Sequence, residues 1–302
     1  MTFREDSFYV VCNHRTDEHV TNSFVLNNKY FRRLHYLRKV SLFLMLLKLI
    51  MAKTLVLHPD HKANKAQFEE AIHGFEANKD FVTKGDRNTI KKVSVDGNTY
   101  VIKKFKTPGF FQGLVYRFLR KSKARRSFEY ASRLIELGIN TPHPVCYSET
   151  FSVGLKESYY VCKHLEYDFD FRVLNHNPKW PNRDEILRQV AAFTYRLHEN
   201  KVNFLDHSPG NTLMVEKGKG AYDFYLIDLN RMKFESMSFE KRMRNFRRLW
   251  LSKHMINIMA DTYAKLSNNT FELTHSLMTR YSRAFQKKVN AKKVRRRRRN
   301  SG

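Results

Sequence analysis

Three polar residues in one stretch of the chain have the types and the spacing that magnesium-dependent phosphoryl transfer requires. Asp206 and Asn211 lie five residues apart, and Asp228 follows at the end of an apolar run. Such a reaction needs a group that orients the incoming hydroxyl and accepts its proton, together with oxygen ligands for the metal on the nucleotide phosphates. We interpret Asp206 as the catalytic base, and Asn211 and Asp228 as magnesium ligands.

The local sequence predicts a hairpin that would bring these residues together. The Pro-Gly pair between Asp206 and Asn211 favours a tight turn. An apolar run at 213–215 and another at 224–227 read as two strands, and the Lys/Gly segment 217–220 reads as the turn between them. Such a hairpin would place the metal ligands at its two open ends.

Each of these motifs alone is weak, because an Asp-to-Asn turn or an aspartate at a strand end is common. Their order is more specific: D-x-x-x-x-N, a hairpin and an apolar-apolar-Asp are typical of the catalytic and metal-binding segments of kinase-like folds. The form DHSPGNTL…LIDLNR resembles the lipopolysaccharide core kinases, which phosphorylate Kdo or heptose sugars attached to lipid A. A second similarity to this family is ARRSFEYAxxLxxxGIxTP at residues 124–142.

The resemblance implies an α+β, two-lobed protein-kinase-like fold. We expect an N-lobe at 51–165, made of a small antiparallel sheet and one helix, and a mainly helical C-lobe at 166–288. The sequence agrees with a sheet, because Asp96-Gly97 predicts a tight hairpin turn between strands 90–95 and 100–105.

Kinases hold the nucleotide phosphates with a strand lysine, and two neighbouring lysines are candidates. Lys103 shares a strand face with Val101 and Phe105 and should point into the lobe, whereas Lys104 should point outward. We therefore assign Lys103 as the phosphate-binding lysine. In the kinase interpretation, Glu129 on a helix at 122–137 pairs with Lys103.

Two further segments are expected to contact the nucleotide. Gly85 lies in a polar turn where a phosphate-covering loop belongs, although the turn holds one glycine rather than a glycine-rich run. The strand leading to Lys163, His164 and Leu165 resembles the approach to the hinge between lobes. There the nucleotide base is held by backbone groups, so side-chain identity carries little information.

The substrate side of the site differs from that of protein kinases. Phe204 and Leu205 stand where those enzymes have His-Arg before the catalytic aspartate, and Leu-Asn follows Asp228 in place of Phe-Gly. The segment 231–238 is too short for a long activation segment, which favours a glycan or small-molecule acceptor. Asn230 and Arg231 are candidate contacts to that acceptor.

The formal net charge of +27 favours polyanionic partners, such as an anionic glycolipid or membrane surface, and the charge alone does not separate these from nucleic acid. Basic and aromatic residues alternate at 114–126, where the functional interpretation is a dock for anionic lipid. The basic segment 289–302 is expected to be disordered. Three cysteines without metal-ligand spacing indicate a reducing, cytosolic setting.

The first fifty residues are read as an uncertain extension. Residues 41–52 are apolar but too short for a membrane span and suit an interfacial amphipathic helix. Met51 opens a segment that looks like a natural start, so translation beginning at Met51 is an alternative hypothesis.

The resemblance therefore implies an ATP- and Mg²⁺-dependent kinase that phosphorylates a Kdo or heptose hydroxyl of the lipid A core, with Kdo–lipid A as the expected glycolipid, at the inner face of a Gram-negative inner membrane. Nucleic acid is not the expected partner, and the sequence does not give an oligomeric state. Two alternatives remain open. One is a kinase for another acceptor, either an aminoglycoside-type small molecule or a protein. The other is a pseudokinase or a basic protein that binds membrane or nucleic acid.

Overall fold

The computed structural model describes residues 36–39, 51–85 and 88–300. The chain divides into two compact units, Met1–Leu49 and Ile50–Gly302. Within the first unit only 36–39 are described, and they form an exposed helical turn. The amphipathic helix predicted from residue 41 onward lies outside the described residues as far as residue 50. From Ala52 the chain is the first strand of the second unit.

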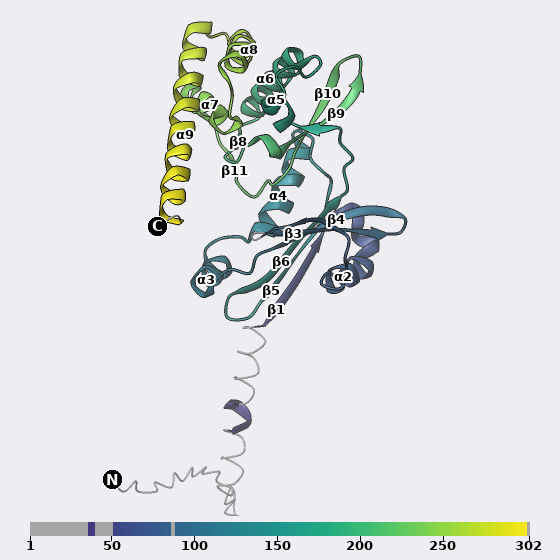
Figure 1. Ribbon diagram of the computed structural model, residues 1–302. Coiled ribbons are helices and arrows are strands. Elements are labelled where there is room, and N and C mark those ends of the chain that lie inside the picture. The colour runs from purple at the N-terminus through teal and green to yellow at the C-terminus, as the bar shows by residue number, and fades with distance from the viewer. Residues whose placement is uncertain (1–35, 40–50, 86–87, 301–302) are drawn as a thin grey trace, which may run out of the picture. The chain divides into compact units, whose positions relative to one another are not determined.

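An antiparallel six-stranded sheet begins the second unit, with strand order β1-β5-β6-β4-β3-β2 (Figure 1). Its strands in chain order are β1 (Ala52–Leu57), β2 (Phe81–Lys84), β3 (Asn88–Val95), β4 (Asn98–Phe105), β5 (Pro144–Phe151) and β6 (Leu155–Lys163). The predicted hairpin between β3 and β4 is present. Asp96 (φ 48°) and Gly97 (φ 73°) are both left-handed, as a tight turn between twisted strands requires.

In the described part of this lobe three α-helices accompany the sheet, of which the kinase resemblance implied one. They are α2 (Lys65–His73), α3 (Phe110–Phe118) and α4 (Lys123–Glu136), and a 3₁₀ turn, η1 (Pro59–Asn64), precedes α2. The predicted helix at 122–137 is α4: the Ser122 hydroxyl accepts the N–H of Arg125 at its start, and left-handed Gly138 follows its end. A small core joins α2 to the sheet through Phe68, Ile72 and Phe75.

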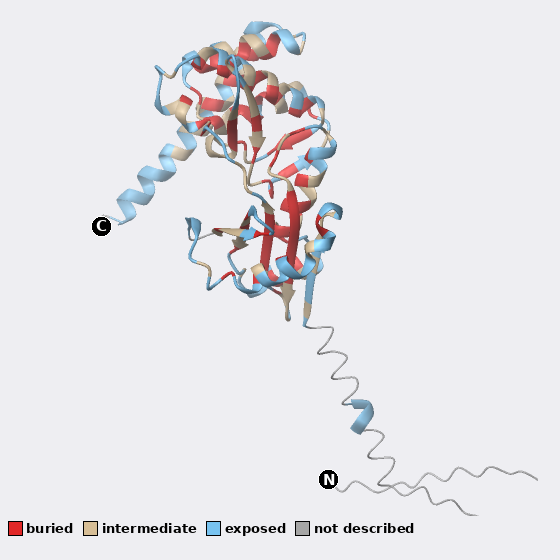
Figure 2. Cartoon of the chain, turned by 90° about the vertical axis from the view of Figure 1, so that its right-hand side faces the viewer, coloured by how far each residue is buried: buried red, intermediate tan, exposed pale blue. Residues whose placement is uncertain are grey.

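The second lobe is mainly helical (Figure 2), and the larger core extends from it to α4 and the sheet. Its helices are α5 (Arg172–His176), α6 (Arg183–Glu199), α7 (Phe239–Asn245), η3 (Phe246–Leu249), α8 (Lys253–Leu266) and α9 (Phe271–Asn300). Its short strands and turn are β7 (Phe169–Asp170), β8 (Val202–Phe204), η2 (Pro209–Asn211), β9 (Thr212–Gly218), β10 (Ala221–Leu226) and β11 (Met232–Phe234). The stripe expected along α6 is buried at Ile186, Val190, Phe193 and Leu197.

Two helical predictions differ from the structure. A single helix over 238–267 is interrupted after η3, because Trp250 adopts a left-handed conformation (φ 59°) and the Ser252 hydroxyl caps the new helix α8. The segment 289–302, expected to be disordered, continues α9 as far as Asn300. Lysine and arginine are good helix formers, so they extend a helix already begun by packed residues. Figure 2 shows this end of α9 as exposed. No helix in the described ranges has the length and hydropathy of a membrane span.

Candidate active site

The loop that carries Asp206 is fixed by pairing between two short strands. β8 and β11 are antiparallel, with Phe204 opposite Met232, and the Leu205 N–H donates to the Arg231 carbonyl at 3.0 Å. Phe204 is fully buried and stacks on His207. The departure from the His-Arg pair of protein kinases therefore supplies an apolar anchor directly before the catalytic loop.

The structure brings the two predicted metal ligands together as the hairpin predicts. β9 and β10 pair antiparallel, and just beyond them the Ile227 N–H donates to the Asn211 carbonyl at 3.0 Å. The Asn211 amide also donates to the Asp206 carbonyl at 2.9 Å, which ties the third residue into the same cluster. Asp228 has a left-handed backbone (φ 56°), a strained conformation for a residue other than glycine that is frequent at functional sites.

This cluster fits a magnesium ion by its donor types. The Asn211 amide nitrogen makes a hydrogen bond within the loop, and its amide oxygen remains as the atom that could bind a metal ion. Asp228 uses Oδ1 for its contacts to protein donors and has Oδ2 in addition. Carboxylate and amide oxygens are the ligands that hard divalent cations prefer.

Strand alternation separates the two candidate lysines of β4. Lys103 is mostly buried, and its Nζ lies 2.6 Å from Asp228 Oδ1. Lys104 points to the other face and pairs with Glu76 and Glu157 at 2.6 and 2.8 Å. Burial lowers the pKa of Lys104, but the hydrogen bonds that it donates to these carboxylates outweigh burial and raise the pKa above the usual range. Only Lys103 therefore faces the Asp228 side of the lobe.

The expected ion pair between Glu129 and Lys103 is not formed. Glu129 instead binds Arg125 at 2.9 Å, one turn earlier on α4, and Lys121 at 2.8 Å. Burial raises the pKa of Glu129, but the hydrogen bonds from these two cations more than offset it, so the pKa is lowered. The physical reason is competition: two local cations hold the carboxylate while Asp228 holds Lys103.

The other predicted nucleotide contacts lie at the ends of two strands, the edge strand β2 and the inner strand β6. Gly85 follows β2, and residues 86–87 of the same turn are outside the described residues. At the hinge, the N–H groups of Lys163 and His164 donate to the carbonyls of His143 and Thr99 at 2.9 and 3.0 Å. The Leu165 N–H makes no hydrogen bond to any described residue. A base bound at the hinge would therefore use this N–H and the neighbouring carbonyls.

Of the two candidate acceptor contacts, one is exposed and one is buried. The Arg231 side chain is 56% exposed, and its Nη1 lies 3.5 Å from Asp206 Oδ2. Asn230 is buried; its amide donates to Asp228 Oδ1 at 2.9 Å, and its carbonyl accepts from Arg126 at 2.9 Å. Asn230 therefore positions Asp228 and does not face an acceptor, because the Leu-Asn sequence turns its side chain back into the protein.

Sequence reasoning missed a buried network that holds the loop carrying Asp206. Asn245 of α7 donates to Asn203 Oδ1 at 2.9 Å and to the Phe204 carbonyl at 3.0 Å, and its amide oxygen lies 3.2 Å from His207 Nδ1. Burial lowers the pKa of His207 to about 4, so this imidazole is neutral at physiological pH. An asparagine 39 residues from Asp206 gives no spacing signal in the sequence.

Sequence reasoning also missed a group of cations next to Asp206. The Arg248 Nη2 lies 2.6 Å from Asp206 Oδ1, so the carboxylate faces guanidinium groups from both Arg231 and Arg248. A shallow cavity of about 130 Å³ adjoins them and is lined by Asn203, Leu205, Lys241, Arg244, Asn245, Arg247 and Arg248. Burial, and next the charges of Arg244 and Arg248, lower the pKa of Arg247. A larger cavity of about 420 Å³ between β1 and α2 lies away from these groups.

The antiparallel sheet with its inward lysine, the helical lobe and the hairpin ending in Asp228 define a protein-kinase-like fold. The model of the lipopolysaccharide kinase (Kdo/WaaP) family matches residues 84–276, more than half of the chain. The chain therefore belongs to the lipopolysaccharide kinase (Kdo/WaaP) family, a family of phosphotransferases. This confirms the resemblance drawn from the DHSPGNTL and LIDLNR segments.

One solved structure with a TM-score above 0.5 supports the fold. The structure titled "WaaP in complex with acyl carrier protein" aligns with 78% of this chain and 98% of its own, at 19% identity and a TM-score of 0.56. The Rio2 kinase–ADP/Mg²⁺–phosphoaspartate complex from Chaetomium thermophilum aligns with 86% of each chain, at 14% identity and a TM-score of 0.42. No curated protein matches the sequence.

Proposed function

We infer that this protein transfers the γ-phosphate of ATP to a sugar hydroxyl, of Kdo or heptose, in the lipid A–core region of lipopolysaccharide. The observation that carries this proposal is the cluster in which Asp206, Asn211 and Asp228 meet Lys103 across the two lobes. Membership of the lipopolysaccharide kinase family supports the acceptor class.

Each residue of the cluster has a distinct part in this proposal. Bound ATP supplies the phosphoryl group, and bound Mg²⁺ neutralises charge on its phosphates. Asn211 and Asp228 would hold the metal, and Lys103 would hold the phosphates. Asp206 would orient the acceptor hydroxyl and accept its proton at a carboxylate oxygen. Arg231 and Arg248 contact that carboxylate and fix its direction.

The cations near Asp206 favour an anionic acceptor. The cavity beside this carboxylate is lined by Lys241, Arg244, Arg247 and Arg248. A phosphate or a carboxylate would stabilise these crowded guanidinium groups, because each binds a guanidinium in a bidentate manner. A Kdo sugar on lipid A carries such groups. An aminoglycoside is a polycation and would be repelled from the same surface, which argues against that alternative.

The remaining kinase alternative is a protein acceptor, and the segment after Asp228 is too short to bind one along its length. Only β11 and a few residues separate Asp228 from α7, which begins at Phe239. This segment offers no extended platform on which a peptide could lie. A glycan that enters beside Asp206 needs no such platform.

A basic apolar surface on α3 supports contact with an anionic bilayer. We define the α3 surface by its exposed large apolar side chains: Phe110, Phe111, Val115, Phe118 and Leu119. Exposed Arg120 and Lys121 follow directly. Apolar side chains that enter a bilayer and cations that meet its headgroups are the pattern of an interfacial helix. The protein would then work as a peripheral enzyme at the inner face of the inner membrane.

Acceptor specificity provides the test. With Mg–ATP, the protein should phosphorylate Kdo–lipid A and leave an aminoglycoside and a basic test protein unmodified. Arg247→Ala should raise the KM for Kdo–lipid A with little change in kcat, and Arg188→Ala, an exposed arginine on α6, should change neither. Transfer to the aminoglycoside or the protein in place of the glycolipid would overturn the proposal. No Mg–ATP binding by folded protein would indicate the pseudokinase alternative.

Vesicle sedimentation tests the membrane contact separately. Wild-type protein should co-sediment with vesicles containing anionic lipid and be released as salt rises. Phe111→Ser with Phe118→Ser should reduce binding by more than about tenfold, since each buried aromatic contributes roughly 1.5–3 kcal/mol. Leu273→Ser, a comparable exposed apolar residue on α9, is the matched control. Undiminished binding of the double variant would refute the role of α3.

A further inference from the structure

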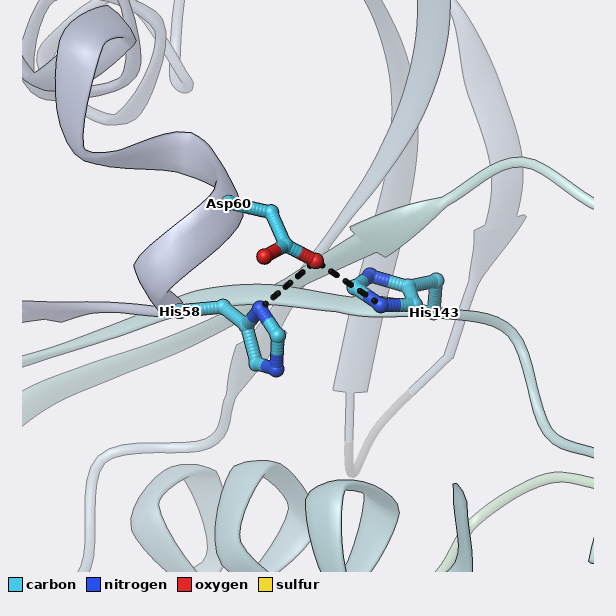
Figure 3. A group of neighbouring side chains, drawn as sticks. All are labelled: His58, Asp60 and His143. Atoms are coloured by element: carbon cyan, nitrogen blue, oxygen red, sulfur yellow. Dashed lines mark ion pairs between the residues drawn. The ribbon is translucent and has the colours of Figure 1, made fainter. Parts of the chain in front are cut away.

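Two histidines and an aspartate gather outside the candidate active site, on one side of the sheet (Figure 3). His58 follows β1 and immediately precedes η1, Asp60 lies in the first turn of η1, and His143 immediately precedes β5. β1 and β5 pair antiparallel, and the His58 N–H donates to the Val145 carbonyl at 2.7 Å. Backbone pairing therefore brings together residues that are more than eighty positions apart in the sequence.

The spacing of the side-chain atoms is that of ligands around one metal ion. His58 Nδ1 lies 3.3 Å from Asp60 Oδ2, and His143 Nε2 lies 3.6 Å from the same oxygen. One atom from each residue falls within a set no wider than 4.8 Å. With zinc–ligand bonds of about 2.0–2.1 Å, two ligands of a tetrahedral site lie about 3.4 Å apart. Figure 3 shows both imidazole rings turned toward the carboxylate between them.

Three buried imidazole nitrogens here have no hydrogen-bond partner among the described residues: His143 Nδ1 and two others. One is His58 Nδ1, whose 3.3 Å approach to Asp60 does not have hydrogen-bonding geometry. The other is Nε2 of the buried His61, whose ring centre lies 5.9 Å from that of His143. Buried polar atoms normally find partners, so an unpartnered one points to a bound ion or water.

We propose that His58 Nδ1, Asp60 Oδ2 and His143 Nε2 bind one divalent transition-metal ion of the zinc class. Two imidazoles and one carboxylate form a ligand set that zinc accepts, and a fourth position remains for water or for His61. Metal binding uses neutral imidazole and ionised carboxylate as ligands, so the site should lose its metal in acid.

The metal would fasten two parts of the sheet lobe next to the hinge. It would join the β1–η1 corner to the start of β5, and the His143 carbonyl accepts the N–H of Lys163 at 2.9 Å. The site therefore lies one hydrogen bond away from the segment expected to hold the nucleotide base. It is a structural clamp in this proposal and takes no part in phosphoryl transfer. The proposal is independent of the acceptor.

Direct metal binding tests the proposal on the full chain after chelator treatment. Zn²⁺ titration should give one ion per chain, and Co²⁺ should give the absorption bands of a tetrahedral nitrogen–oxygen site. His58→Gln and His143→Gln should each weaken binding by more than about 100-fold, since even outer partners of zinc ligands are worth roughly 10–100-fold. His73→Gln, an exposed histidine of α2, should bind as wild type. Zn²⁺ should raise the Tm of wild type and of His73→Gln, and it should leave the Tm of His58→Gln and His143→Gln unchanged.

Asp60→Asn keeps the test decisive if a histidine variant fails to fold. The Asp60 side chain is 63% exposed, so the amide should leave the Tm in chelator unchanged while weakening Zn²⁺ binding by at least about tenfold. The proposal is overturned if folded wild type takes up no Zn²⁺, which would leave plain imidazole–carboxylate ion pairs. It is also overturned if the variants bind as wild type, or if the Co²⁺ spectrum shows thiolate ligation by Cys146 or Cys162.

Discussion

Replacing Asn245 by alanine should destabilise the protein by roughly 2–6 kcal/mol, although Asn245 lies in no recognisable motif. Its amide satisfies Asn203 Oδ1 and the Phe204 carbonyl, and its oxygen faces His207 Nδ1. Each buried polar group left without a partner costs about 1–3 kcal/mol. In the variant the Phe204 carbonyl still accepts the N–H of His207 at 3.2 Å. Two buried atoms, Asn203 Oδ1 and His207 Nδ1, are then left without a hydrogen-bond partner.

Urea denaturation measures this effect as a fall in the midpoint at constant slope. Asn98→Ala is the matched control, because Asn98 is exposed and donates one hydrogen bond, to the Asp96 carbonyl. We expect that control to stay within about 0.5 kcal/mol of wild type. A loss below about 1 kcal/mol in Asn245→Ala, equal to the control, would show that the buried network does not hold the catalytic loop.

Three further predictions address acid stability, packing and nucleotide binding. His207 has a folded pKa of about 4, against about 6.5 when unfolded, so the unfolded chain binds the extra proton. Stability should therefore fall by on the order of 3 kcal/mol between pH 6.5 and 4, and His207→Gln should flatten that slope. Gly154→Ala should cost about 1–3 kcal/mol, because a Cβ would lie 2.7 Å from the Gly113 backbone of α3. Lys103→Met should weaken Mg–ATP binding by more than about tenfold, since losing a close charge partner costs about 2 kcal/mol or more.

Each of these predictions has its own refuting result. An unchanged pH slope in the histidine variant, measured by urea denaturation at each pH, would remove His207 as the titrating group. For the packing prediction, Gly74→Ala is the control, since Gly74 has φ −74° and an ordinary contact at the Cβ position. Equal stability of the two alanine variants would contradict a tight contact at Gly154. Calorimetric ATP titration of Lys104→Met should match wild type, and a larger loss there would reverse the assignment of Lys103.

The sequence was most informative where local pattern determines geometry. The order of Asp206, Asn211 and Asp228 around a hairpin predicts their meeting, because turn and strand signals act over a few residues. Strand alternation likewise predicts which of Lys103 and Lys104 faces inward, since the side-chain period of a strand is two. The family resemblance supplied the two-lobed fold that these local patterns leave open.

Predictions that depended on competition or on distant partners could not be made in this way. Glu129 binds Lys121 and Arg125, and nothing in the spacing says that these two outcompete Lys103. Arg248 of η3 and Asn245 of α7 contact the loop that carries Asp206 through tertiary packing, which leaves no spacing signal in the sequence.

The cluster of His58, Asp60 and His143 also could not be predicted from the sequence, because the β1–β5 register that assembles it has no signal there. The hypothesis that translation begins at Met51 stays a prediction, and the intact mass of the native protein would test it.

Phosphate transfer by Asp206→Asn is the most direct test of the central claim. Wild-type protein with Mg–ATP and Kdo–lipid A should release ADP and add one phosphate to the glycolipid, as read by mass spectrometry. Asp206→Asn should still bind Mg–ATP but transfer at least about 100-fold more slowly, the usual contribution of a positioned base. Undiminished transfer by Asp206→Asn would contradict the role of Asp206, and absence of transfer by folded, ATP-binding wild type would contradict the proposed acceptor.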